Sequence, residues 1–213
     1  MHNVSTPLKC GANIVFVVGS SETTVRDDTI LLNMAKEHMF KGKIFEYYRH
    51  VLKRYHDIDF AFKLDMDTQV CVPGLMAKID EAIEQKAEFF GWPHDHSSCG
   101  QYGHCPPKSG EWHFMSGPVF GVSRELLTHA FKVTGANYSI DGLDDLYVGK
   151  WVHSAKPNNI TSYKLDCLYG RGARGPTCSG VRCPVIHWQF RKSLGSRLGD
   201  LCPAYYGETA WPR

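Results

Sequence analysis

The sequence lacks the features that mark membrane, nucleic-acid-binding and several catalytic classes of protein. No stretch approaches the roughly 20 consecutive apolar residues of a membrane-spanning helix, and the net charge is only +2, without a run of Lys and Arg. So small a charge gives no electrostatic basis for binding a nucleic acid, and no such partner is expected. The sequence also contains no G-x-S-x-G, Walker or H-E-x-x-H pattern, which removes the usual signals for serine hydrolases, P-loop NTPases and zinc proteases.

The composition is that of a globular protein. Of the 213 residues, 43% are hydrophobic and 22% are charged, which argues against the disordered and fibrous classes. A chain of this length has room for one substantial core, so we expect one domain or at most two small ones.

Cysteines and glycosylation sequons favour a lumenal or extracellular setting. The chain contains eight cysteines, many for a cytosolic protein, at positions 10, 71, 99, 105, 167, 178, 183 and 202. Three N-x-S/T sequons occur at Asn3, Asn137 and Asn159. The first ten residues have no apolar h-region and are not a signal peptide. We therefore expect the targeting segment of the full-length protein to lie outside this chain.

Short apolar runs alternate with amphipathic segments in the first half of the chain. Runs rich in Val, Ile, Leu and Phe predict buried strands at 14–18, 29–33, 60–65 and 88–93. Apolar residues spaced by three and four predict helices at 42–56 and 74–86, with Pro73 opening the second. This alternation predicts an α/β fold, with a mixed, mostly parallel sheet that has helices on both faces.

The pattern resumes after an irregular segment. Residues 94–111 are rich in Gly, Ser, Pro, His and Cys and predict a long surface loop. Beyond it we expect a strand at 112–122, a helix at 124–132 with Ser123 as its N-cap, a helix at 146–153 and a strand at 185–188.

Two aspartates follow the predicted strand at 60–65. Asp65 and Asp67 are separated by one residue where a buried strand becomes a loop, which is where α/β folds place ligands. Carboxylate oxygens are preferred ligands of Mn²⁺ and Mg²⁺, and such a metal can bridge the phosphates of a nucleoside diphosphate. An acidic turn at a strand end has the same pattern, so metal binding and a purely structural turn are both open.

A second acidic pair, Asp144 and Asp145, precedes the predicted helix at 146–153. The helix dipole favours acidic residues at a helix N-terminus without any function. A carboxylate within reach of an acceptor hydroxyl would instead act as a general base. Both interpretations are open from these residues.

Histidines and cysteines supply two further candidates. His187 has apolar neighbours, so a core histidine is the default, whereas a neutral imidazole facing the two strand-end aspartates would be a third metal ligand. Zinc could be bound by a group of loop residues, namely His94, His96, Cys99, His104 and Cys105. Their spacing matches no standard finger, and an oxidising lumen favours a disulfide. The pairing cannot be read, since eight cysteines allow on the order of a hundred complete pairings.

Taken in order, several segments resemble the β-1,3-glycosyltransferases of glycosyltransferase family 31, and more closely the protozoan Golgi transferases that use UDP-galactose or UDP-N-acetylglucosamine. The matching segments are FVVG (16–19), DDTILL (27–32), GKIFEYY (42–48), FKLDMDT (62–68), SGPVFGVS (116–123) and GLDDLYVG (142–149). An ordered series of this kind is more specific than any single motif.

The resemblance implies a GT-A fold and an inverting transfer from a UDP-sugar, with Mn²⁺ or Mg²⁺ as cofactor. The family's K-x-D-D-D falls on Lys63, Asp65, Met66 and Asp67, so that Met66 stands where the family usually has an aspartate. By this resemblance Lys63, Asp65 and Asp67 form the donor site, and the two aspartates hold the metal together with His187. Lys63 either orients Asp65 or is a structural strand residue.

The family's E-D-V-Y-x-G falls on residues 144–149. This makes Asp145 the expected catalytic base and places Asp144 where the family has a glutamate. Gly117 would line the acceptor side or pack a tight strand. The implied partners are a UDP-sugar, with galactose or N-acetylglucosamine favoured, and a glycan acceptor. The implied location is the Golgi lumen, with the membrane reached only through the anchor of a full-length type II membrane protein.

By the same resemblance, a glycosyltransferase domain spans 14–192, with a nucleotide-sugar half at 14–68 and an acceptor half at 69–192. It lies between an unpatterned N-terminus at 1–13 and a C-terminal tail at 193–213. Family members begin with a strand and an Arg-rich helix that have no counterpart before residue 14, so we expect a truncated transferase. The rival expectations are a non-catalytic relative and a small zinc-binding module built on 94–105.

Overall fold

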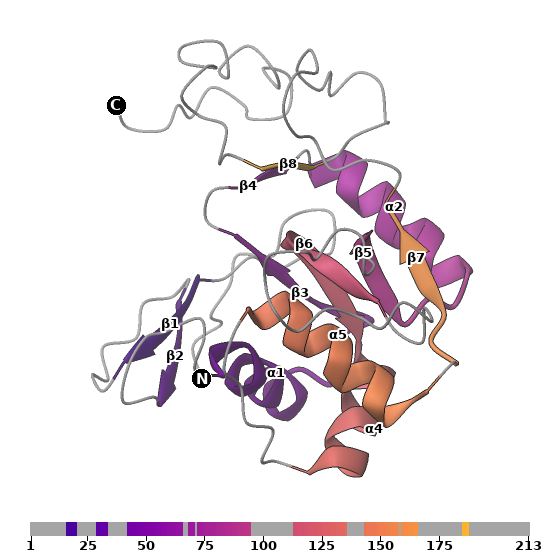
Figure 1. Cartoon of the computed structure of the whole chain (residues 1–213). Helices are drawn as coiled ribbons and strands as arrows, with labels where there is room; N and C mark the ends of the chain where they lie inside the picture. Colours follow the sequence, from indigo (N-terminus) through magenta and orange to yellow (C-terminus); the bar gives the residue numbers. More distant parts are fainter. Residues whose placement is uncertain are drawn as a thin grey trace, which may run out of the picture.

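The structure, a computed structural model, describes residues 16–20, 29–33, 42–65, 68–70, 72–94, 113–135, 143–157, 159–165 and 185–187. Its elements, drawn in Figure 1, are β1 (Phe16–Ser20), β2 (Thr29–Asn33), α1 (Lys43–Arg54), β3 (Phe60–Leu64), β4 (Thr68–Val70), α2 (Val72–Glu84), β5 (Phe89–His94), β6 (Phe114–Ser123), α4 (Arg124–Thr134), α5 (Asp144–Ala155), β7 (Ser162–Lys164) and β8 (Val185–His187).

The centre of the fold is a four-stranded sheet in the order β3-β6-β5-β7. β6 is antiparallel to both of its neighbours, β3 and β5, whereas β5 and β7 are parallel. The expected mixed α/β fold is confirmed, but the expectation of a mostly parallel sheet is wrong for these four strands. β6 reverses direction after β5, and an apolar run predicts a strand without specifying its direction.

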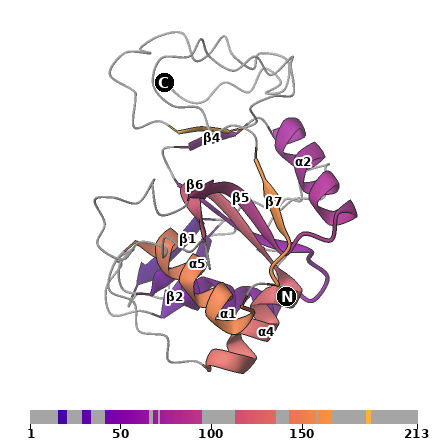
Figure 2. The same cartoon turned by 45° about the vertical axis from the view of Figure 1, so that its right-hand side comes forward.

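Helices cover both faces of this sheet, as expected (Figures 1 and 2). α1, α4 and α5 pack on one face, where Phe89 and Phe120 belong to the core. α2 packs on the other face with the neighbouring strand residues Phe90 and Val119. The faces alternate because successive side chains of a strand point in opposite directions.

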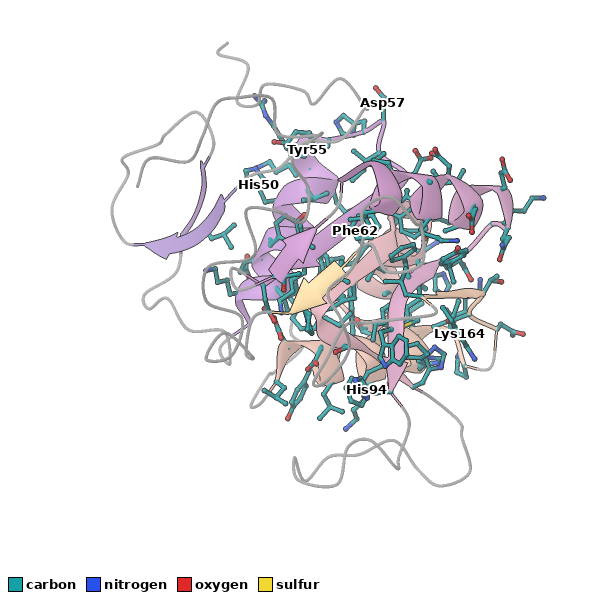
Figure 3. The ribbon with its side chains drawn as sticks, turned by 90° about the horizontal axis from the view of Figure 1, so that it is seen from above. His50, Tyr55, Asp57, Phe62, His94 and Lys164 are labelled. Atoms are coloured by element: carbon teal, nitrogen blue, oxygen red, sulfur yellow. The ribbon has the colours of Figure 1, made fainter. Side chains whose placement is uncertain are left out.

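Aromatic rings fill both cores. Trp151 of α5 is fully buried, and the rings of Phe45 in α1 and Phe131 in α4 meet it edge to face at 4.8 Å each. On the other face, the ring of Phe62 meets that of Phe90 at 5.2 Å. Viewed from above, Phe62 lies near the middle of the molecule (Figure 3). The contacts of Trp151 thereby join α1 and α4 to α5.

Two further strand pairs are separate from the central sheet. β1 and β2 are parallel, with Phe16 opposite Thr29, and Figure 1 shows them beside α1. β4 and β8 are antiparallel, with Thr68 opposite His187. The second pair brings residue 187 beside the chain that follows Asp65, although the two are far apart in the sequence.

Local signals set the ends of the helices. Ser123 caps α4 as predicted, because its Oγ accepts the N–H of Leu126 at 3.1 Å. α5 begins at Asp144, earlier than the predicted start at residue 146, so the acidic pair lies in its first turn. Within the described ranges, no helix is long and apolar enough to cross a membrane.

Candidate active site

Strand β3 ends at Leu64, directly before Asp65. Lys63 lies two residues beyond Ala61 and faces the same side of the sheet, toward α5. The backbone N–H of Asp65 donates to the carbonyl of Pro118 in β6 at 3.1 Å. The Nζ of Lys63 donates to Oδ1 of Asp65 at 2.5 Å and to the carbonyl of Gly117 at 2.7 Å. Lys63 therefore connects the end of β3 to β6.

The first turn of α5 supplies two more carboxylates. Asp144 Oδ1 accepts the N–H of Asp145 at 2.9 Å, and Asp145 Oδ1 accepts the N–H of Leu146 at 2.7 Å. These N–H groups lack intrahelical partners, so the acidic pair does stabilise the helix start. The same side chains also reach outward, since Asp145 Oδ2 accepts the N–H of Gly117 at 2.9 Å and Asp144 Oδ2 lies 3.6 Å from Nζ of Lys63.

Gly117 lies where the two acidic centres meet. A Cβ atom at this position would lie 3.2 Å from Oδ2 of Asp145, 3.6 Å from Oδ2 of Asp65 and 3.6 Å from Nζ of Lys63. Oδ2 of Asp65 and Oδ2 of Asp145 therefore border the same small volume beside Gly117. The two oxygens can be no farther apart than the sum of their distances from this Cβ position. The sequence singled out these two aspartates in separate motifs, and the fold brings them together.

Burial raises the pKa of both carboxylates in α5. The Asp144 residue is 8% exposed, and burial raises the pKa of its carboxyl, although the Lys63 ammonium opposes the shift. Burial, followed by the charge of Asp144, raises the pKa of Asp145 to about 6. A carboxylate with a pKa near 6 is mostly ionised at neutral pH and binds a proton more readily than an ordinary aspartate. This is the property that a general base needs.

The residues expected to hold a metal are described only in part. Asp65 lies in the cluster, Asp67 lies outside the described residues, and of His187 only the backbone is described. The β4–β8 pairing places residue 187 opposite Thr68, close in the chain to Asp65. Among the side chains that the structure describes, no group of three or more His, Cys, Asp or Glu is placed to hold a metal ion.

Of the residues expected to hold a metal, Asp65 is the one whose side chain the structure describes. Carboxylate oxygens are the ligands that Mn²⁺ and Mg²⁺ prefer, and the ammonium group of Lys63 is a cation already bound to Asp65. Gly117 has no Cβ to fill the volume beside that carboxylate. Asp65 is therefore one carboxylate that such a metal could use beside its ion pair with Lys63, and metal binding by Asp65, Asp67 and His187 stays a prediction.

The predicted zinc or disulfide loop lies outside the described residues, apart from His94. The ring of His94 stacks on that of Phe114 at 5.3 Å, which places it against β6. Neither a disulfide nor a zinc site at Cys99 and Cys105 is tested by the described part of the chain.

The structure also contains a histidine pair that the sequence patterns did not indicate. The rings of His113 and His153 lie 4.7 Å apart, and Nε2 of His113 lies 3.0 Å from Oγ of Ser162. His153 is 8% exposed, and among the described residues neither of its ring nitrogens has a hydrogen-bond partner. Burial lowers the pKa of both histidines, that of His153 to about 4. No local signal predicts this pair, because β6 and α5 bring the two rings together.

No protein-family model and no curated protein matches this chain. Its function is therefore inferred from the geometry of the acidic cluster and from the order of its motifs.

Proposed function

We propose that this chain is the catalytic part of an inverting, UDP-sugar-dependent glycosyltransferase with a GT-A-like fold. It would move a hexose or N-acetylhexosamine, with galactose or N-acetylglucosamine favoured, to a glycan hydroxyl in a β-1,3 linkage. The observation that carries the proposal is the meeting of Asp65 and Asp145 beside Gly117. Segments that resemble the donor and base motifs of the family thereby border one site.

Asp145 is the residue that would take the acceptor proton. In an inverting transfer, the acceptor oxygen attacks the anomeric carbon from the face opposite UDP. The new C–O bond forms while the bond to the diphosphate oxygen breaks, and the hydroxyl proton passes to the base. Both oxygens of Asp145 accept backbone N–H bonds, from Gly117 and Leu146, so the carboxylate has a fixed orientation before the acceptor arrives.

Asp65 would serve the donor side of the same volume. It would hold the divalent cation together with Asp67 and His187. Such a cation, when bound, offsets the charge that grows on the leaving diphosphate. Asp65 follows β3 and Asp145 belongs to α5, so donor and acceptor groups are served by different elements that meet at β6.

A lumenal setting agrees with the surface of the described part. Of the three sequon asparagines, Asn159 is described, and it is exposed in the segment that precedes β7. Together with the cysteine content, this exposure supports placing the enzyme in the Golgi lumen, where asparagine side chains at sequons carry glycans.

The first test is the binding of UDP, measured by titration calorimetry with Mn²⁺ and again with EDTA. We expect metal-dependent binding by the wild type and by Asp80→Asn, a control in the exposed part of α2. Binding should disappear in the double variant Asp65→Asn/Asp67→Asn. A folded wild-type chain that binds no UDP would refute the proposed enzyme and favour a non-catalytic relative.

The second test separates the base from the donor site. Asp145→Asn keeps the size of the side chain and removes its ability to take a proton, although its single carbonyl oxygen can accept only one of the two backbone N–H bonds. We expect unchanged UDP binding and a loss of transfer of about 10²–10⁴-fold, the range for general base catalysis. Transfer at the wild-type rate would exclude Asp145 as the base.

A further inference from the structure

Lys63 contacts both acidic centres of the proposed site. Its Nζ lies 2.5 Å from Oδ1 of Asp65, 2.7 Å from the carbonyl oxygen of Gly117 and 3.6 Å from Oδ2 of Asp144. The side chain of Lys63 is only 15% exposed, and that of Asp144 only 11%. Charges so enclosed are stable only when they are compensated by opposite charges and hydrogen bonds, which these contacts supply.

We propose that Lys63 is a positioning residue that couples the two acidic centres. Its ammonium group holds Asp65 and Asp144 together, and it shares Asp65 with the divalent cation of the proposed function. The sharing of Asp65 rests on that proposed function, whereas the connection between β3 and α5 does not.

The contacts assign different tasks to the two adjacent carboxylates of α5. Asp144 lies beside Lys63 and accepts the N–H of Asp145, so it anchors the start of the helix. Asp145 instead accepts the N–H of Gly117 and borders the volume next to that residue. Lys63 therefore acts on the proposed base through Asp144, and it keeps three neighbouring carboxylates from repelling one another.

A divalent cation at Asp65 would compete with the ammonium group. Both are cations, and both use the carboxylate that Lys63 already binds. Because such coupling is reciprocal, a bound metal weakens the ion pair between Lys63 and Asp65, and that ion pair weakens the binding of the metal. Loss of the ammonium group therefore has two opposite effects. The cluster without metal becomes less stable, and a metal stabilises it more than before.

The experiment compares Lys63→Met with Lys63→Arg and with Lys78→Met. Lys78 is a matched control, because its side chain is similarly enclosed, at 19% exposed, but its Nζ pairs at 2.9 Å with Glu81, which is 44% exposed on α2 and away from the acidic cluster. The thermal unfolding midpoint of the whole chain is measured in EDTA and again with Mn²⁺ as the sole added ligand. In EDTA, we expect Lys63→Met to lose roughly 5–10 °C, Lys78→Met to stay within about 1 °C of wild type, and Lys63→Arg to recover most of the loss.

The response to Mn²⁺ tests the sharing of Asp65. We expect the increase in midpoint to be at least about twice as large in Lys63→Met as in the wild type. Equal, non-zero increases in both would overturn the proposed role of Lys63 and leave the metal site standing. Absence of any increase in both would refute the metal site itself. The two failures are therefore distinguishable.

A second variant covers the case in which Lys63→Met does not fold. In Lys63→Met/Asp144→Asn the charge of the partner carboxylate is removed together with the ammonium group. If the two residues are coupled, the double variant folds in EDTA even where Lys63→Met does not, or has a higher midpoint than a folded Lys63→Met, despite its additional substitution. A double variant that is no more folded and no more stable than Lys63→Met would overturn the coupling.

Discussion

Replacement of His153 by leucine should remove an acid-sensitive component of the stability. His153 lies in α5, 8% exposed, with its ring 4.7 Å from that of His113. Neither of its ring nitrogens has a hydrogen-bond partner in the described part of the chain. Protonation would therefore place a charge in a site that offers no described acceptor for it. Leucine has a similar volume, suits a helix and cannot be protonated.

The pKa values determine the sign and size of the effect. The pKa of His153 is lowered to about 4 in the folded protein and is about 6.5 in an unfolded chain. The contribution of His153 to the free energy of unfolding is constant above pH 6.5. It falls as the pH drops from 6.5 toward 4, because the unfolded state then binds more protons than the folded state. At pH 5 linkage gives at most about 2 kcal/mol, and we expect about 1 kcal/mol because water and the His113 ring can relax around the charge.

The carboxyl group of Asp145 changes the stability with pH in the opposite direction to His153. Its folded pKa is raised to about 6, so its contribution to stability is present at low pH and is lost as the pH rises through 6. The two effects partly cancel in the wild type, and the pH curve of the wild type alone does not reveal either one. The comparison must therefore be made between the wild type and the His153→Leu variant.

The assay is urea unfolding at pH 7.5 and pH 5.0. The free energy of unfolding of His153→Leu, relative to wild type, should rise by about 1 kcal/mol on going to pH 5.0. Ser154→Ala is a control in the same helix, because this exposed neighbour of His153 has no group that titrates between these two pH values, so its difference from wild type should be nearly constant. A constant difference for His153→Leu would show that the buried ring accepts a proton without penalty, which would refute the reasoning.

Other consequences of the geometry can be tested by single changes. Gly117→Ala should keep the fold and lower kcat/KM for transfer by about 10–100-fold, because its Cβ would lie 3.2 Å from Oδ2 of Asp145 and 3.6 Å from Oδ2 of Asp65; an unchanged kcat/KM would contradict this. The kcat/KM for transfer should rise with pH around a midpoint near 6, as Asp145 ionises, and Asp145→Asn should abolish that dependence. Gly149→Ala would place a Cβ 2.5 Å from that of Phe114 and should lower the urea-derived stability by about 2–4 kcal/mol. Ser123→Ala should cost about 1 kcal/mol in the same assay through loss of the helix cap. A neutral result at Gly149 would show that α5 and Phe114 can move apart without cost, and a neutral result at Ser123 would show that the cap is not stabilising.

Features encoded by neighbouring residues were predictable from the sequence. The strand at 29–33 matches β2, and the predicted helix at 42–56 contains α1. The Ser123 cap is confirmed, because a hydroxyl at the start of an amphipathic segment is a local signal. In the candidate site, two motifs singled out Asp65 and Asp145. Their roles stay predictions, although their proximity is now visible.

Features that depend on distant contacts could not be predicted. The direction of β6 is set by its pairing with β3 and β5, and no property of its own residues specifies it. β4 and β7 have three residues each, too few to show a period. The ion pair between Lys63 and Asp144 likewise joins residues far apart in the sequence. The sequence left two interpretations of the acidic pair open, and the geometry shows that capping the helix and facing Gly117 are compatible.

The aromatic contacts around Trp151 hold α5 near its middle, so a small tilt at that point displaces the N-terminal end of the helix. Phe45 and Phe131 clamp the helix at that residue, and Asp145 lies six residues away, roughly 9 Å along the axis. A tilt of about 3° at the clamp would displace the carboxylate by about 0.5 Å, enough to impair a reaction that depends on alignment. If Asp145 is the base that we propose, conservative changes at Phe45 and Phe131 that keep the fold should therefore lower transfer more than they lower UDP binding, because they alter the orientation of α5.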